Sequence, residues 1–115
     1  MNRKIVFVSG DVFFWARVEA AARAAGCEAV RASDEPTMEN AFRLEGVCRV
    51  IVDLNCRGID IASWAARWKA TAPAPQLVAF GSHVDAGGLE AARTAGFDVV
   101  MANSQFHRSL REWIS

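Results

Sequence analysis

Five short apolar runs, most of them rich in β-branched residues, alternate with helical patterns along this chain. They span residues 4–8, 27–30, 47–52, 77–80 and 99–101. Runs that are apolar almost throughout predict strands buried on both faces, which requires a parallel sheet covered by helices on each side. Right-handed crossovers between such strands give a three-layer α/β sandwich. The pattern therefore predicts a (βα)5 fold in a single domain, residues 1–115, with no chain left for an output domain.

Helix start and stop signals fit this order. Gly26 is placed to end the first helix, and Asp60 and Asp85 are placed to begin the third and fourth. The last helix is expected to be capped by Asn103 or Ser104. Its apolar face would then be formed by Phe106, Leu110, Trp113 and Ile114.

Charge and cysteine content exclude several classes of protein. Thirteen basic and thirteen acidic side chains cancel, so the chain lacks the basic footprint of a general nucleic-acid binder. No apolar run is long enough to span a membrane, and no secretory signal is recognisable, so a cytoplasmic location is expected. Cys27, Cys48 and Cys56 form no CxxC pair, which favours free thiols acting as small hydrophobes over a disulfide or a zinc site.

Polar side chains gather where the predicted strands end. Because the carboxyl ends of parallel strands share one edge of the sheet, a binding site is expected there. The residues at those ends are Ser9, Gly10, Asp11, Ser33, Asp53, Gly81, Ser82, His83 and Asn103.

Several landmarks of this order resemble the receiver domain of bacterial two-component response regulators. Asp53 closes the third strand, Gly58 and Asp60 follow it, and residues 95–98 (AGFD) precede the fifth strand. The resemblance implies a flavodoxin-like sheet with strand order 2-1-3-4-5. It also implies helices 1 and 5 on one face, helices 2, 3 and 4 on the other, and Asp53 in the place of the phospho-accepting aspartate.

The residues that carry phosphotransfer in that family are largely replaced here. Ser9 and Gly10 stand where the family has its two magnesium-binding acids, and Asn103 stands where it has its lysine. Gly81 takes the place of the family's hydroxyl residue, and Val100 takes the place of its switch aromatic. Asp11 and Ser82 each lie one residue beyond a replaced position, and Asn55 would offer only its backbone carbonyl. Asp53 is therefore expected to accept hydrogen bonds from Ser9 or Ser82, and no magnesium is expected at ordinary millimolar levels.

These departures favour a degenerate receiver, or pseudo-receiver, that signals through protein–protein contacts. It would be no enzyme and need no cofactor, and its partner would be another signalling protein or a second copy of itself. One alternative is a phosphorylatable receiver using Asp53, with Asp11 and Asp53 holding a metal and Ser82 replacing the hydroxyl. Another is a small flavodoxin-like enzyme or ligand-binding domain that uses Asp53, Ser82 and His83.

Two sets of side chains are candidates for an interface. Phe13 and Trp15 form either an exposed aromatic pair beside the site or part of a wide core-facing stripe. His107, Arg108 and Arg111 lie opposite the apolar face of the last helix. That helix belongs to the output and dimerisation surface in the family that the chain resembles.

Overall fold

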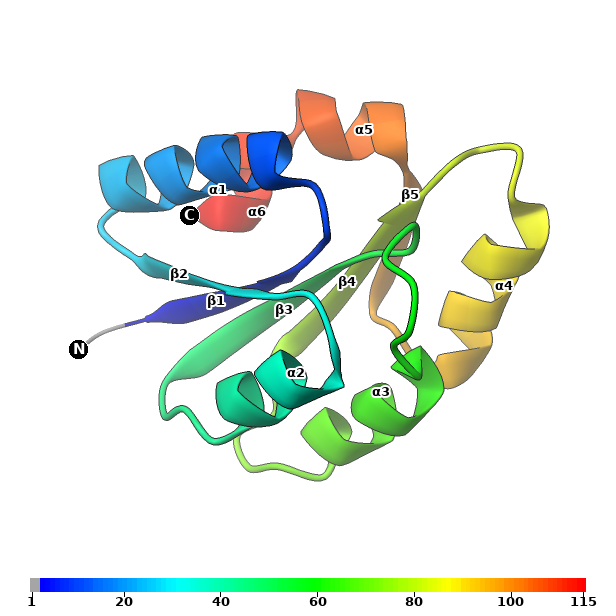
Figure 1. Ribbon diagram of the computed structural model, residues 1–115, viewed down its shortest axis with the longest axis horizontal. Coiled ribbons are helices and arrows are strands. Elements are labelled where there is room, and N and C mark those ends of the chain that lie inside the picture. Colours follow the sequence, from blue (N-terminus) through cyan, green and yellow to red (C-terminus); the bar gives the residue numbers. More distant parts are fainter. Residues whose placement is uncertain (1–2) are drawn as a thin grey trace.

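A five-stranded parallel sheet lies between two layers of helices in the computed structural model, which describes residues 3–115 (Figure 1). The strand order is β2-β1-β3-β4-β5 and every neighbouring pair is parallel. The fold class and strand order predicted from the sequence are therefore confirmed. The elements are β1 (Lys4–Val8), α1 (Val12–Ala25), β2 (Glu28–Ala32), α2 (Glu35–Phe42), β3 (Val47–Asp53), α3 (Ile61–Lys69), β4 (Gln76–Gly81), α4 (Ala86–Ala95), β5 (Val99–Ala102), α5 (Asn103–Arg108) and α6 (Leu110–Ile114).

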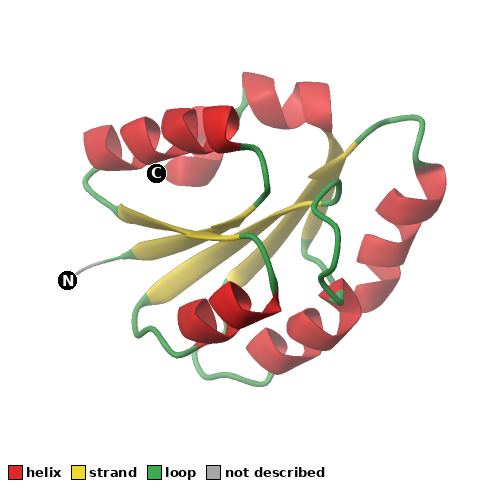
Figure 2. Cartoon of the chain, viewed as in Figure 1, coloured by secondary structure: helices red, strands yellow, loops and turns green. Residues whose placement is uncertain are grey.

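Each face of the sheet has its own hydrophobic core, as the apolar strands require. Helices α1, α5 and α6 cover one face, and α2, α3 and α4 cover the other (Figure 2). Phe7 and Ile51 point to the first core, whereas Val6 and Val50 point to the second. This distribution of helices is the predicted one.

The predicted helix ends are largely correct. Asp60 and Asp85 cap α3 and α4 with side-chain hydrogen bonds, as predicted. Asp11, for which no cap was predicted, caps α1 in the same way. Gly26 ends α1 in the left-handed region at φ 76°, where glycine has no steric penalty. The amide of Cys27 donates to the carbonyl of Ala22 as part of that helix end, and so β2 begins at Glu28 rather than at residue 27.

The C-terminal helix differs from the prediction in two ways. Neither Asn103 nor Ser104 caps it, because α5 begins at Asn103 directly after Ala102, with no side-chain cap. The expected single helix is also divided at Ser109. The Ser109 hydroxyl donates to the Gln105 carbonyl (2.7 Å) and accepts from Trp113 Nε1 (3.0 Å). Hydroxyl bonds of this kind to the preceding turn compete with a regular helix.

The three cysteines are half-buried and unpaired in the described part of the chain, rather than fully buried. Cys27 Sγ donates to the Ile114 carbonyl at 2.9 Å, which ties the end of α1 to α6. Within residues 3–115, no helix has the length and apolar character needed to cross a bilayer.

Candidate functional site

Asp53 meets Ser9 at the carboxyl edge of the sheet. Strands β1 and β3 are neighbours, and the pairing of Val8 with Val52 brings the next residues side by side. The Ser9 hydroxyl donates to Asp53 Oδ2 at 2.8 Å. Ser9 is 0% exposed, so this hydrogen bond is shielded from water on the serine side. Ser9, one of the two hydrogen-bond donors expected for Asp53, thus contacts the carboxylate directly.

The other carboxylate oxygen of Asp53 is also occupied by a donor. The amide of Asn55 donates to Oδ1 at 2.9 Å, in the local turn that aspartate side chains commonly form with the chain two residues on. The following loop is fixed to the sheet because the Leu54 amide donates to the Phe80 carbonyl at 2.9 Å. Both oxygens of Asp53 therefore accept hydrogen bonds from the protein itself.

Asp11 lies beside the site, but its side chain begins α1. Its Oδ1 accepts hydrogen bonds from the amides of Phe13 and Phe14, each at 3.0 Å. Its own amide donates to Ser9 Oγ at 3.1 Å. Because Ser9 Oγ also donates to Asp53, the serine hydroxyl joins the start of α1 to the end of β3.

An open cleft of about 360 Å³ extends from Asp53 toward β5 and α5. It is lined by Asp11, Phe14, Asp53, Leu54, Asn55, Phe80, Gly81, Ser82, Asp85, Asn103 and His107. Most of the predicted pocket residues therefore share one cavity. Three of them do not line it: Ser9 is buried beneath Asp53, Gly10 lines a separate hollow, and His83 is exposed outside the cleft.

Gly81 leaves little room for a side chain at the end of β4. A Cβ atom there would lie 3.2 Å from both Cβ and Cδ1 of Leu54, closer than ordinary van der Waals contact. Ser82, one residue later, brings the nearest hydroxyl of that strand end to the cleft, and its Oγ lies 3.4 Å from the Val84 amide.

A second hollow of about 380 Å³ lies on the other side of Asp53 and includes Gly10, Cys56 and Arg57. No three His, Cys, Asp or Glu side chains within residues 3–115 are grouped closely enough to hold a metal ion. Burial and then the nearby charge of Asp53 raise the pKa of the Cys56 thiol, which keeps this cysteine in its weakly nucleophilic protonated form.

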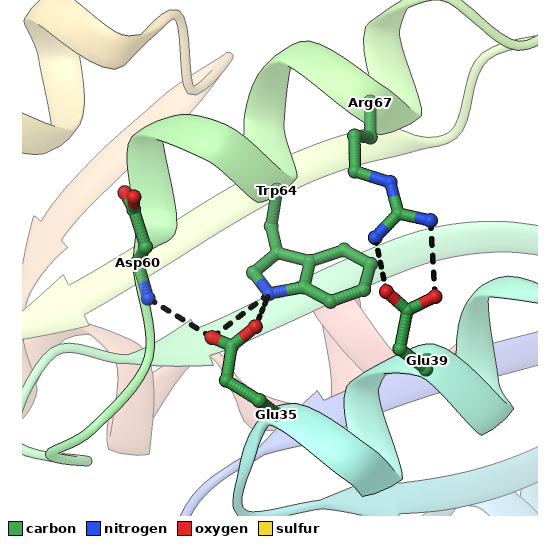
Figure 3. A network of polar contacts seen from close by, with 5 residues as sticks. All are labelled: Glu35, Glu39, Asp60, Trp64 and Arg67. Atoms are coloured by element: carbon green, nitrogen blue, oxygen red, sulfur yellow. Dashed lines mark hydrogen bonds and ion pairs between the residues drawn. The ribbon is translucent and has the colours of Figure 1, made fainter.

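A polar network between α2 and α3 holds the loop that follows Asp53 (Figure 3). Glu35 accepts from Trp64 Nε1 at 2.9 and 3.1 Å and from the Asp60 amide at 3.2 Å. Arg67 forms a two-pronged pair with Glu39, and its hydrogen bond lowers the pKa of that carboxyl. The sequence indicated Trp64 only as a core residue, because helical spacing does not show where its indole N–H finds an acceptor.

The structure separates the two aromatic residues proposed for an interface. Phe13 is 84% exposed, whereas Trp15 is half-buried and its ring stacks with Phe7 at a centroid distance of 6.4 Å. The prediction of an exposed aromatic pair is therefore wrong for Trp15. Its long side chain reaches the core from a position beside the buried stripe of α1. His107, Arg108 and Arg111 are all exposed.

The hydrogen bonds of Asp53 predict how the domain responds to its replacement. Asp53→Asn should change the free energy of unfolding by no more than about 1 kcal/mol, because the amide keeps one acceptor and supplies a donor to Ser9. Asp53→Ala should cost about 1–3 kcal/mol, since the buried Ser9 hydroxyl loses its acceptor. Urea unfolding of both variants tests this, and equal costs would contradict the proposed pairing.

Comparisons based on sequence alone do not assign the chain to a protein family. No protein-family model matches it, and no curated protein matches it either.

Solved structures, in contrast, match over nearly the whole chain. A response regulator receiver domain from Bermanella marisrubri has a TM-score of 0.77 at 15% identity, covering 100% of both chains. A response regulator from Burkholderia pseudomallei, solved with a phosphorylated aspartic acid and a calcium ion, has a TM-score of 0.78 at 13% identity. That match covers 99% of this chain and 67% of the other.

An orphan response regulator of H. pylori has a TM-score of 0.74 at 13% identity, covering 97% of this chain and 90% of that one. The chain therefore has the fold of response regulator receiver domains. At these identities the similarity establishes the fold alone.

Proposed function

We propose that residues 1–115 form one receiver-like signalling domain that acts through protein–protein contacts, without ordinary magnesium-dependent phosphorylation of Asp53. The observation that carries this proposal is the 2.8 Å hydrogen bond from Ser9 to Asp53. In the receiver family that position holds an acid facing the metal. Here it holds a buried neutral donor that satisfies the aspartate directly.

The residues around Asp53 are a poor fit for magnesium. This ion needs near-octahedral oxygen ligands, usually including one or two carboxylates free to bind it. Both oxygens of Asp53 accept protein hydrogen bonds, and Asp11 Oδ1 accepts the first amides of α1. Gly10 offers no side chain. A metal would therefore have to displace bonds that hold β1, β3 and α1 together.

Among residues 3–115, no lysine or arginine lines the cleft, whereas phosphoryl transfer uses a fixed cation to stabilise charge on the moving group. Asn103 lines the cleft where the family has lysine. The similar regulator from Burkholderia pseudomallei carries a phosphorylated aspartic acid together with a calcium ion. We infer that the present domain has departed from that chemistry while keeping the fold that presents its surfaces.

One observation favours the alternative of a phosphorylatable receiver. The cleft of about 360 Å³ is open beside Asp53 and has Ser82 in its wall, so there is room for a phosphoryl group. An enzyme that pairs Asp53 with His83 has less support, because His83 does not line the cleft. We propose no catalytic activity for the domain.

Beryllofluoride with magnesium, a mimic of aspartyl phosphorylation, distinguishes the two functions. We expect the amide NMR spectrum of this domain to remain unchanged in the presence of both, because no metal site is available to hold the complex. A receiver domain similar to this one has been solved in a beryllofluoride-activated form and serves as the positive control. Saturable shifts around Asp53 that disappear in Asp53→Asn would show that the pocket works and the proposal is wrong.

A further inference from the structure

A positively charged hollow lies between α1 and the α5–α6 segment, away from the hydrogen bonds of Asp53. It has a volume of about 260 Å³. Its lining includes the three arginines Arg17, Arg108 and Arg111, together with His107, and Glu112 is the one acid among the lining residues. We refer to this feature as the arginine hollow. It holds a local excess of positive charge in a chain whose net charge is zero.

The three arginines of the hollow have no acidic partner in the described part of the chain, and Arg17 lies over the ring of Phe14, 5.5 Å from its centroid. Among residues 3–115, no carboxylate lies within 4.0 Å of the guanidinium groups of Arg17, Arg108 or Arg111. Arg67 and Arg93, by contrast, each have an acidic partner. Guanidinium groups gathered around a concave surface focus a positive potential there and bind carboxylates with good geometry.

An exposed aromatic side chain stands one helical turn before Arg17 of the arginine hollow. Phe13 is 84% exposed and lies four residues before Arg17, hence on the same side of α1. A phenylalanine so fully in water offers apolar surface that a partner protein can bury. The ring of His107 lies 4.3 Å from that of Phe14 and lines both the hollow and the Asp53 cleft. His107 thus joins the hollow to the mouth of the site, and Phe13 presents apolar surface one helical turn from Arg17.

We propose that this surface binds an acidic segment of a partner protein, with carboxylates in the arginine hollow and an apolar side chain against Phe13. This inference rests on the proposed function, since it names the chemistry of the protein partner that such a domain would contact.

The surroundings favour a short acidic peptide segment over other polyanions. Three aspartates, Asp11, Asp53 and Asp85, line the cleft next to the hollow and would repel a phosphate backbone running across the surface. The hollow itself, with a volume of about 260 Å³, has room for carboxylate side chains. A peptide can place its acids in the hollow and turn uncharged side chains toward the cleft, which neither a nucleic acid nor an anionic membrane can do.

Binding of defined probes tests the proposal. We would titrate the 15N-labelled domain with a peptide of Glu-Glu-Leu-Phe repeats, and in parallel with a Lys-Lys-Leu-Phe peptide, a single-stranded oligonucleotide and phosphatidylserine vesicles. We expect saturable shifts from the acidic peptide at residues 13–17 and 107–111. Arg17→Glu/Arg111→Glu should weaken its binding at least about tenfold, the effect of losing one charge-assisted contact. Phe13→Ala should weaken it less.

The matched control is Arg43→Glu, which reverses an exposed arginine at the end of α2, on the other face of the sheet. It should leave binding of the acidic peptide unchanged. The inference is overturned if the acidic peptide does not bind, if the lysine peptide binds as well, if Arg43→Glu has the same effect, or if only the oligonucleotide or the vesicles bind. The beryllofluoride experiment is independent of these outcomes. Failure of the acidic-peptide proposal can therefore be distinguished from failure of the proposed function, which a working phosphorylation site would show.

Discussion

Replacing Ser9 with aspartate is expected to destabilise the metal-free domain by about 2–4 kcal/mol. The substitution removes the hydrogen bond that Ser9 donates to Asp53 and puts a second carboxylate at nearly the same place. Two carboxylates about 4 Å apart repel each other by about 1 kcal/mol in bulk water and about 4 kcal/mol at the effective dielectric constant of a protein. Ser9 is 0% exposed, so water cannot relieve this repulsion.

Magnesium should recover part of that loss once both acids are present. A Cβ atom at Gly10 would meet no atom within 4 Å, so Gly10→Asp is sterically tolerated. Ser9→Asp/Gly10→Asp would then offer carboxylates around a common point near Asp53. A ligand that binds only the folded state stabilises it by about 1.4 kcal/mol at ten times its Kd. We expect the melting temperature of this double variant, but not of the wild type, to rise with millimolar magnesium.

The control is Ser9→Asn, which has the size of aspartate without its charge. It should cost clearly less than Ser9→Asp, because only packing and hydrogen bonding change. Thermal melts of the four proteins, each with and without magnesium, give the comparison. Stabilisation of the wild type by magnesium would show that the native pocket binds metal, and equal costs for Asn and Asp would show that charge is not the cause.

The sheet and its helices were predictable because each rests on a local signal. Apolar runs such as 4–8 predict strands buried on both faces, and Asp60 and Asp85 stand directly before helices that need a cap. The strand order came from the resemblance to receiver domains, since periodicity does not determine which strands are neighbours.

The details of the site depend on contacts between distant residues, which no local pattern reveals. Ser9 and Asp53 are 44 residues apart, and their hydrogen bond exists because β1 and β3 pair in one register. Sequence reasoning proposed Ser9 and Ser82 equally as donors to Asp53. The structure places Ser9 Oγ at 2.8 Å from the carboxylate, and leaves Ser82 in the wall of the cleft. Arg17 was missed because a single arginine on a helix surface gives no signal until α5 and α6 bring others beside it.

The division of the C-terminal helix has the same origin. Ser109 stands within a sequence that is helical by its apolar spacing, and its hydroxyl contacts become visible only in three dimensions. The consequence is that α5 and α6 are six and five residues long. Helices this short are unstable on their own in water, so tertiary packing must hold them.

Phe106 supplies much of that packing. Its side chain is 0% exposed and stacks on Phe80 with a centroid distance of 4.2 Å and an interplanar angle of 4°. It also meets the edge of Phe14 at 5.7 Å. Phe106 therefore packs α5 against both β4 and α1. Because α1, α5 and α6 together form the arginine hollow, the hollow depends on this packing.

Phe106→Ala is therefore expected to lower the free energy of unfolding by about 3–5 kcal/mol, the usual cost of deleting a buried phenylalanine. The amides of α5 and α6 should exchange faster with solvent, because these short helices lose their anchor. Phe13→Ala is the matched control: it removes the same side chain from an 84% exposed position and should change stability by less than about 0.5 kcal/mol. Urea unfolding and amide exchange of both variants test whether Phe106 stabilises this surface while Phe13 is only exposed on it. If Phe106→Ala costs no more than Phe13→Ala, α5 is held by something other than the aromatic stack.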